Sequence, residues 1–378
     1  MLNEGMNGFL VFDIVFEGQS LNYDQGIGNV QQLKKIHYEG ETHTMVSRYA
    51  LRYSLLETGK GLWNWTLADR DVWVEVGSGD QKVLQPNARM LCKLLDYEDL
   101  NFFGFLLTGE SEKSKQTKRS STESGEAKGG AQIQVARPAA VKITHAISLE
   151  PYKFDSHFNV NLGIAKRAGK LGEVQNIFIL EEHRSLYKYS VAVDLSSLGR
   201  QEIYFNSKPT DIPEDCKSSL TEEAGGKFYK LTLNSSKDQK KLLLQLIAAL
   251  FRLSRSIKGR HEDLSPKLMI ASYYTDWYKS YFNSIQLSSG RSRSTVIKRE
   301  NDGSVIVEEQ EAPHLTLKVS GKIGKNSKVY KAPSIEAQIL DSNSDVITDD
   351  PNDIIDFINK NVTKVNKNTI KEIKQKII

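Results

Sequence analysis

The fold of this chain is decided by GFLVFDIVFEG, residues 8–18. The even positions Leu10, Phe12, Ile14 and Phe16 are all apolar, while the odd positions include Asp13. A period of two is that of a β-strand, with one face in the core. We therefore expect this stretch to be a core strand, and the segments that follow to be arranged around it.

A loop and a helix follow this strand directly. The loop, residues 18–35, is rich in glycine and asparagine, includes Asn22, and ends in Lys34 and Lys35. Such residues tolerate positive φ and let a backbone pass close to a ligand. Residues 44–58 then predict a helix that is capped at Thr44 or Ser47. Its predicted apolar positions are Met45, Tyr49, Leu51, Leu55 and Leu56.

Two arginines, Arg48 and Arg52, are spaced four residues apart in this helix and therefore share one of its faces. Neither has an acidic residue three or four positions away that would suggest a local ion pair. We interpret them as phosphate ligands, with ordinary surface charge as the alternative. The hydroxyl of Ser47 lies near the helix start, where backbone N–H groups favour anions.

Length and composition are those of an ordinary globular protein. The 378 residues are 39% hydrophobic, which suggests two or three structural units. No run approaches the roughly 20 apolar residues of a membrane span, and the first residues lack a signal-peptide pattern, so we expect a cytoplasmic protein without a membrane partner. Cys92 and Cys216, the only two cysteines, are expected to be plain thiols, and no metal or cofactor is predicted.

Positive charge is concentrated in one part of the chain. Residues 252–299 carry ten Lys/Arg against three acidic residues, a net charge of +7, while the rest of the chain sums to −3. Aromatic residues are interleaved with these charges between Tyr273 and Phe282. Phosphate attraction with base stacking would need such a pattern, but a solvated surface beside a core strand would also produce it.

The middle of the chain predicts an insertion and a projection. Residues 59–108 are rich in Trp and Phe and can bury a small core, and 109–136 predict a flexible loop. Residues 141–147 alternate as a strand with His145 on the apolar face, where a lone histidine is more often a core residue than a ligand. A second alternating strand follows at 187–193. The residues between the two strands, 151–186, predict a projecting hairpin.

The most strongly predicted helix is 238–255, which is apolar on nearly all sides and therefore buried. A compact basic loop follows at Lys258, Gly259, Arg260 and His261, where a backbone can approach phosphates closely. A second basic loop, mobile by its composition, is expected at 288–295 and contains Arg291 and Arg293. The tail, 341–378, is acidic and then basic and predicts a peripheral helix.

Without the insertions, the order of elements is β-α-β-β-α-β, so the fold class is α+β, with a ferredoxin-like or RRM-like palm. Residues 1–58 form its first half, 59–137 an inserted finger domain that includes the flexible loop, and 138–340 its second half. This second half of the palm carries a thumb hairpin at about 150–185. Residues 341–378 form the charged helical tail.

Several motifs in this order resemble the RAMP proteins, most closely the DevR-type backbone subunit of type I-B CRISPR Cascade complexes. They are the SLN loop at 20–22, RYALRYSLLE at 48–57, RPAAVKITHAISLEPY at 137–152, VAVDL at 191–195 and the glycine loop at 258–261. The resemblance covers residues 8–340. The glycine loop departs from many RAMP proteins in having a single glycine, and the finger sequence supports no residue-level transfer.

The resemblance implies a protein that polymerises along a CRISPR guide RNA and presents it for pairing with target DNA. Further copies of the chain in a helical filament and other Cascade subunits would be its partners. The positions that match the family's guide-binding surfaces are Asn22, Ser47, Arg48, Arg52, His145 and Lys258–His261. In the thumb, Phe154 and Phe158 are the candidates for a wedge that displaces a base. The grip would be independent of sequence, and the protein would not be an enzyme.

Two alternatives remain open. Related type III subunits cleave target RNA with an acidic residue in the loop after the first strand, and Asp24 occupies such a loop here. A turn-forming aspartate is the competing interpretation of that residue. The second alternative is a stand-alone regulator that binds single-stranded RNA.

Overall fold

The computed structural model describes residues 6–26, 28–38, 40–77, 82–108, 134–170, 177–209, 212–299, 305–340 and 346–377. For residues 289–299 and 305–314 it describes the backbone alone. The predicted flexible loop, 109–136, lies mostly outside these residues. No helix among the described residues is long and apolar enough to cross a membrane.

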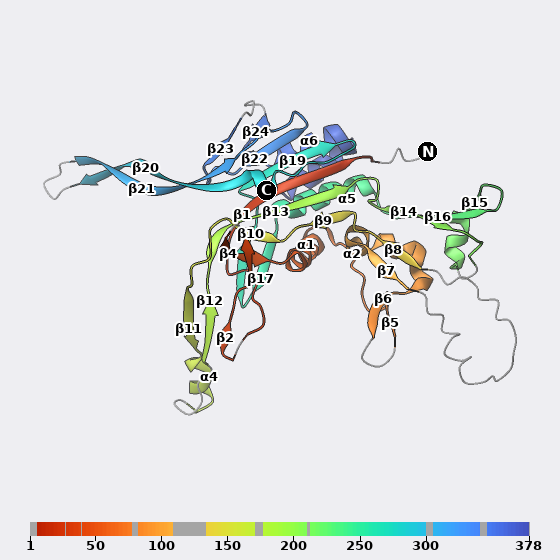
Figure 1. Ribbon diagram of the computed structural model, residues 1–378, viewed down its shortest axis with the longest axis horizontal. Helices are drawn as coiled ribbons and strands as arrows, with labels where there is room; N and C mark the ends of the chain where they lie inside the picture. Colours follow the sequence, from red (N-terminus) through yellow and green to blue (C-terminus); the bar gives the residue numbers. More distant parts are fainter. Residues whose placement is uncertain are drawn as a thin grey trace.

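The predicted core strand is the central strand of the largest sheet, β1 (Figure 1). It pairs antiparallel with β13 on one side and β19 on the other, so that Phe12 lies opposite both Val191 and Ala271. In spatial order the sheet contains β24 (Ile347–Thr348), β22 (Ser327–Lys331), β19 (Leu268–Tyr274), β1 (Phe9–Gln19), β13 (Arg184–Asp194), β10 (Ala146–Ser148), β4 (Glu41–Val46) and β3 (Lys35–Tyr38). β9 (Val141–Ile143) also pairs with β13.

Helices cover one face of this sheet. The even residues of β1 are fully buried in one core with α1 (Arg48–Trp63) and α5 (Gln239–Phe251). From Leu242 to Phe251 all described side chains of α5 except Gln245 are buried, as its apolar run predicted. These two helices pack against each other. α1 also contacts strand β9 of the sheet.

The tail completes the same core, which contradicts the prediction of a peripheral helix. It folds as α6 (Asn352–Ile358), the π-helix η6 (Asn359–Thr363) and α7 (Lys367–Gln375). Ile354, Ile355, Ile358 and Ile373 are fully buried against the α5 side of the core. The charged residues that dominate the tail's composition lie on its outer surface. Composition alone therefore did not reveal that its isoleucines form a buried apolar face.

The other face of the sheet is also covered. Val15, Ile270 and Val329 share a core with Tyr281 and the base of a long hairpin. That hairpin consists of β20 (Ile285–Arg299) and β21 (Val305–Val319), follows the short 3₁₀ turn η4 (Phe282–Ser284), and pairs with β23 (Ala337–Ile339). Figure 1 shows it projecting far beyond the sheet. The predicted mobile loop at 288–295 is therefore wrong: these residues belong to strand β20.

Asp13 lies on this second face and is fully buried. Its carboxylate accepts hydrogen bonds from the hydroxyls of Ser190 and Ser280 and from the backbone N–H of Tyr281, the last at 2.7 Å. Burial raises the pKa of Asp13, while these donors oppose that rise. A polar residue in the core strand is thus tolerated because its oxygens are satisfied.

An arm extends from the end of β1, as the residues between the two alternating strands predicted (Figure 1). It contains β11 (Ser156–Val160), α4 (Leu162–Arg167) and β12 (Ile177–Glu181). β12 pairs in parallel with β2 (Val30–Gln31) of the glycine-rich loop. The arm and the loop after β1 therefore share one small sheet.

A second core lies beside the first. It draws on residues 72–135 but also on 212–233, which the sequence assigned to the palm. The first group comprises β5 (Trp73–Val76), β6 (Val83–Pro86), the 3₁₀ helix η2 (Ala88–Asp96), α2 (Glu98–Phe103), β7 (Phe105–Leu107) and β8 (Val135–Arg137). The second comprises η3 (Glu214–Ser219), β15 (Leu220–Glu223) and β16 (Phe228–Asn234), and β14 (Arg200–Phe205) pairs with β16.

A disulfide joins the two groups. Cys92 in η2 and Cys216 in η3 are bonded, with Cα atoms 5.5 Å apart, so the prediction of two plain thiols is wrong. Their separation of 124 residues gave no sign of this pairing. The bond closes a long loop of the chain within the second core.

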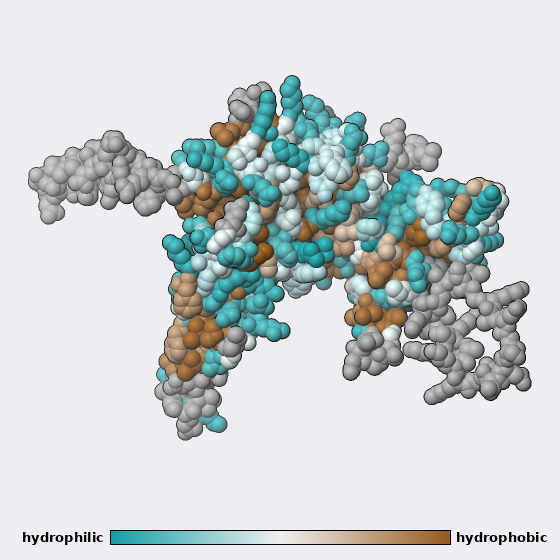
Figure 2. Space-filling model, in the orientation of Figure 1, coloured by the Kyte–Doolittle hydropathy of each residue, from teal (hydrophilic) through white to brown (hydrophobic). Residues whose placement is uncertain are grey.

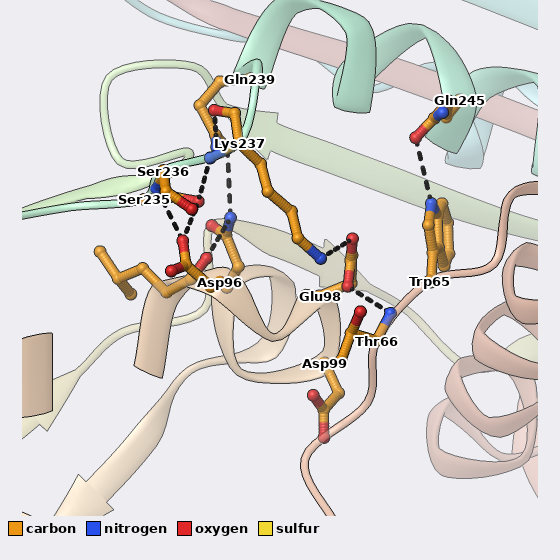
Figure 3. A network of polar contacts seen from close by, with 12 residues as sticks. Trp65, Thr66, Asp96, Glu98, Asp99, Ser235, Ser236, Lys237, Gln239 and Gln245 are labelled. Carbon is orange, nitrogen blue, oxygen red and sulfur yellow. Dashed lines mark hydrogen bonds and ion pairs between the residues drawn. The ribbon is translucent and has the colours of Figure 1, made fainter. Parts of the chain in front are cut away.

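A polar network connects the second core to the start of α5 (Figure 3). The carboxylate of Glu98, 4% exposed, accepts from Lys237 Nζ at 2.6 Å and from the backbone N–H of Thr66 at 2.8 Å. Nearby, Asp96 accepts from the hydroxyl of Ser235 and the N–H of Ser236. These contacts fix the inserted residues against the segment that leads into α5.

Candidate nucleic-acid interface

The first turn of α1 is held from two sides. Ser47 is its N-cap: the Ser47 hydroxyl accepts from the N–H of Ala50 at 3.2 Å, and the Ser47 N–H donates to Asn22 Oδ1 at 2.9 Å. The alternative cap, Thr44, is wrong because it lies within β4. Asn22 and Ser47 therefore do lie together, but their side chains are engaged in building the helix start.

His145 supports the same turn. It lies between β9 and β10, where the predicted continuous strand is broken, so it is not a core residue of that strand. Its Nδ1 accepts from the backbone N–H of Arg48 at 3.0 Å. Burial, together with the positive charges of Arg48 and Lys34, lowers the pKa of His145. The imidazole is thus held neutral, in the form that accepts this hydrogen bond.

This contact predicts a pH dependence of stability. Because the folded-state pKa of His145 is lowered, the unfolded chain binds a proton more readily as the pH falls through about 6.5. We expect the free energy of unfolding to fall as the pH is lowered from 7 through this range, and to fall less steeply in a His145→Asn variant. Denaturant titrations at several pH values measure both slopes. Equal slopes would show that His145 does not cause this pH dependence. The pKa of His183 is also lowered, but His183 is the same in both proteins and therefore does not contribute to the difference between them.

The exposed side of α1 carries Arg48, Tyr49, Arg52 and Tyr53, here called the α1 ridge. Tyr49 was predicted to be apolar core, but it is 63% exposed, and Tyr53 is 64% exposed. The guanidinium carbons of Arg48 and Arg52 lie 5.1 and 5.8 Å from the centre of the Tyr49 ring. The first turn contains no acidic residue. The ridge thus combines cations and aromatic faces at the positive end of a helix dipole.

Arg52 is the more confined of the two arginines. Its guanidinium lies 4.6 Å from the centre of the Phe103 ring in α2, and its Nε is buried without a hydrogen-bond partner among the described residues. Burial first, and then repulsion from Arg48, lowers the pKa of Arg52. An uncompensated, partly buried cation favours an anionic ligand.

The two lysines that end the loop have different roles. Lys35 Nζ pairs with the buried carboxylate of Glu181 at 2.6 Å and lies 4.5 Å from the centre of the Tyr152 ring, so it serves to anchor the arm. Lys34 lies 3.6 Å from Asp24, an exposed residue that also accepts from the N–H of Gln25. No group of three metal-ligating side chains occurs in the described part of the chain.

The basic glycine loop is the turn of a tight hairpin. β17 (Ser254–Ile257) and β18 (Arg260–Asp263) flank Lys258 and Gly259, which both have positive φ (49° and 78°). This is the geometry of a type I′ turn, for which the glycine is needed. Two strands therefore stand between helix α5 and β19, where the sequence predicted a single loop.

Most of the charge in this hairpin is used internally. The Arg260 guanidinium donates to the carbonyls of Gln19 and Ser20 and lies 3.4 Å from Glu182, so it stabilises the end of β1. Lys258 Nζ donates to Gln31 at 3.1 Å. His261 is exposed. Of the loop residues that were predicted to bind RNA, Lys258 and His261 remain accessible to a ligand.

The hairpin and the arginines of the ridge flank α1 on opposite sides. Arg255 in β17 donates from Nε to the Leu21 carbonyl at 2.9 Å, and from Nη1 to the Ala50 carbonyl and the Ser54 hydroxyl. The Arg52 side chain extends away from β17 and lies over the ring of Phe103 in α2. The two basic elements therefore do not face each other across one groove, and Tyr49 and Tyr53 lie between them.

The remaining predicted residues lie elsewhere. Phe154 and Phe158 on the arm are 75% and 64% exposed, and Figure 2 shows apolar surface along this arm. Arg291 and Arg293 lie in β20, opposite Pro313 and Glu311, and their side chains lie outside the described part.

The aromatic residues between 273 and 282 do not form one stacking surface. Tyr281 is buried, the Phe282 ring lies 4.7 Å from Lys188 Nζ, and Trp277 is 89% exposed. The two candidates that sequence reasoning missed are Tyr53 and Arg255. The pair Arg48-Tyr49 is repeated four residues later as Arg52-Tyr53, and this repeat could have identified Tyr53 from the sequence.

Comparison with known proteins gives three results. A search of curated proteins finds no match. A chain of a solved structure titled "CRISPR RNA-guided surveillance complex, pre-nicking" is similar with a TM-score of 0.45 and 9% identity, over 93% of this chain and 99% of that chain. Another, titled "CRISPR RNA-guided surveillance complex", has a TM-score of 0.39 and 9% identity, over 89% and 96%.

The third result concerns the sequence itself. The family model described as "CRISPR-associated negative auto-regulator DevR/Csa2" matches residues 10–289, which include β1, the α1 ridge, the arm, the second core and the β17–β18 hairpin. The match spans well over half of the chain and ends within β20, before strands β21 to β24 and the helical tail. The chain therefore belongs to the CRISPR-associated DevR/Csa2 family.

Proposed function

We propose that this chain binds CRISPR guide RNA as a backbone subunit of a type I Cascade complex in the cytoplasm. The observation that carries the proposal is the α1 ridge, which places the exposed Arg48, the partly buried Arg52 and two exposed aromatic rings at the positive end of a helix without an acidic residue in the first turn. Single-stranded nucleic acid is bound by this combination of charge and stacking. Membership of the family supports the assignment to a CRISPR system.

The fold supports the proposal in its finer form. We interpret the strand order β19-β1-β13-β10, with α1 and α5 on one face, as a ferredoxin-like palm. In this interpretation, the arm is the thumb and the second core is the finger. The wedge would then come from Phe154 or Phe158, whose rings are the most exposed aromatic side chains on the arm.

In the proposed mechanism the protein holds the RNA backbone without reading its sequence. Arg48 and Arg52 neutralise phosphates, Tyr49 stacks on a base, and Asn22, Ser47 and His145 keep the helix start in place. Specificity comes from pairing of the guide with target DNA, as in other guided systems. Further copies of the chain and other Cascade subunits would continue the assembly along the guide.

Two alternatives deserve comparison with this proposal. The family's description as a negative auto-regulator favours a stand-alone RNA-binding regulator, which could use the same ridge. Cleavage of target RNA through Asp24 has less support, because this single carboxylate is engaged by Lys34 and the Gln25 N–H. We therefore propose a binding protein and assign no catalytic residue.

Sequencing the RNA that co-purifies with the full chain tests the proposal. We expect RNA of uniform length whose ends derive from CRISPR repeats, in a particle much larger than one copy of the chain by size-exclusion chromatography. RNA of mixed length bound to a single copy would favour the regulator, and absence of RNA would contradict both. The vector-encoded transcript serves as the background control, because a non-specific binder would retain it in proportion to its abundance.

A further inference from the structure

A cleft lies between the second half of α1 and strand β17, next to the α1 ridge, with which it shares Tyr53. Its volume is about 430 Å³, within the range of roughly 300–1,000 Å³ that is typical of ligand pockets. Its lining residues include Tyr53, Ser54, Glu57, Arg252 and Arg255. Two arginines against one carboxylate give the cleft an excess of positive charge, which favours an anionic ligand.

Arg255 is the fixed cation of this cleft. Its Nε and Nη1 donate to the Leu21 and Ala50 carbonyls and to the Ser54 hydroxyl, and no carboxylate partner is present among the described residues. Burial lowers the pKa of Arg255. A half-buried guanidinium with only neutral partners lacks a counter-charge, and its remaining nitrogen can donate to a phosphate.

Tyr53 supplies an aromatic wall to the same cleft. Its ring is 64% exposed and also belongs to the α1 ridge, so the cleft opens directly beside that surface. A base can stack on this ring whatever its identity. Glu57 is the one carboxylate among the lining residues, and it is exposed to solvent, where its charge is screened.

We propose that this cleft binds one nucleotide of single-stranded RNA, with the base stacked on Tyr53 and the phosphate held by Arg255. The inference rests on the proposed function, because the nucleotide belongs to the strand that lies along the α1 ridge. It adds a second nucleotide position on the opposite side of the helix from Arg52.

Ultraviolet crosslinking with mass spectrometry locates the nucleotide directly. Trypsin cuts after Arg48, Arg52 and Lys60, so it separates Tyr49 and Tyr53 into the peptides 49–52 and 53–60. With the full chain bound to a short oligoadenylate, we expect nucleotide-modified peptide 53–60. Modification of 49–52 alone would support the proposed function but overturn the cleft, whereas failure of the parent chain to bind the oligonucleotide would contradict the proposed function itself.

A matched pair of variants tests the stacking contact. We expect Tyr53→Leu to weaken binding of a fluorescein-labelled oligoadenylate by roughly 5- to 50-fold, and Tyr53→Trp to restore it. Tyr204→Leu, which removes a similarly exposed tyrosine from β14 in the second core region, is the control and should bind as the parent does. Because Tyr53 is largely exposed, its replacement should leave the thermal unfolding midpoint unchanged. Parent-like affinity of Tyr53→Leu would overturn the inference.

Discussion

Replacing Arg48 and Arg52 together by glutamate is expected to weaken binding of single-stranded RNA by about 100- to 1,000-fold at physiological salt. The change removes two cations from the exposed side of α1 and places two anions beside the phosphates. It should also make the dependence of affinity on salt less steep, because fewer counterions are released. Fluorescence anisotropy with a labelled oligonucleotide across a salt series measures both effects, and the RNA retained on purification provides a second readout.

The matched control is Lys367→Glu with Lys371→Glu on α7. These lysines are also exposed and four residues apart on a helix, so the net charge changes by the same amount. We expect this variant to lose far less affinity than the α1 variant. Equal losses would show that only overall charge matters, and normal RNA retention by the α1 variant would contradict the assignment of the ridge. Circular dichroism checks that both variants are folded.

Replacing Lys237 by methionine is expected to lower the free energy of unfolding by about 2 to 3 kcal/mol. Lys237 is the charged partner of the buried Glu98, and methionine keeps the length of the side chain but removes the ammonium group. The buried carboxylate would then retain only the Thr66 N–H. We place the effect at the lower end for a buried ion pair, because Lys237 itself is 32% exposed and solvent screens part of the interaction.

Lys217→Met is the control for this substitution. Lys217 and Glu214 form a close ion pair, but their side chains are 59% and 86% exposed, so its loss should cost less than about 0.5 kcal/mol. Urea titration of both variants measures the difference. Similar values for the two would mean that the Glu98 network does not stabilise the junction between the second core and α5.

The elements that sequence predicted well are those with a local cause. Alternation of apolar residues predicted β1, the continuous apolar run predicted α5 apart from its last residues, and Ser47 was one of the two predicted caps of α1. In each case the signal lies within about a dozen neighbouring residues. The two arginines on one face of α1 follow from the same local geometry.

The features that sequence missed depend on distant parts of the chain. The Cys92–Cys216 bond, the second core shared with residues 212–233 and the burial of Ile354 all need contacts across more than 100 residues. Tyr49 was misplaced because an aromatic residue beside leucines has the pattern of a core residue, whereas its ring is exposed and contacts the guanidinium of Arg48. Arg260 was predicted to bind RNA because its partners in β1 and the arm are distant in sequence and cannot be identified from its neighbours.

The position of β1 in the sheet has a consequence for synthesis of the chain. This strand leaves the ribosome well before its partners, because β13 and β19 begin only at residues 184 and 268. At 5 to 20 residues per second, its apolar face waits roughly 10 to 35 seconds for the first partner. During that interval the unpaired edges and apolar face of β1 are prone to aggregation.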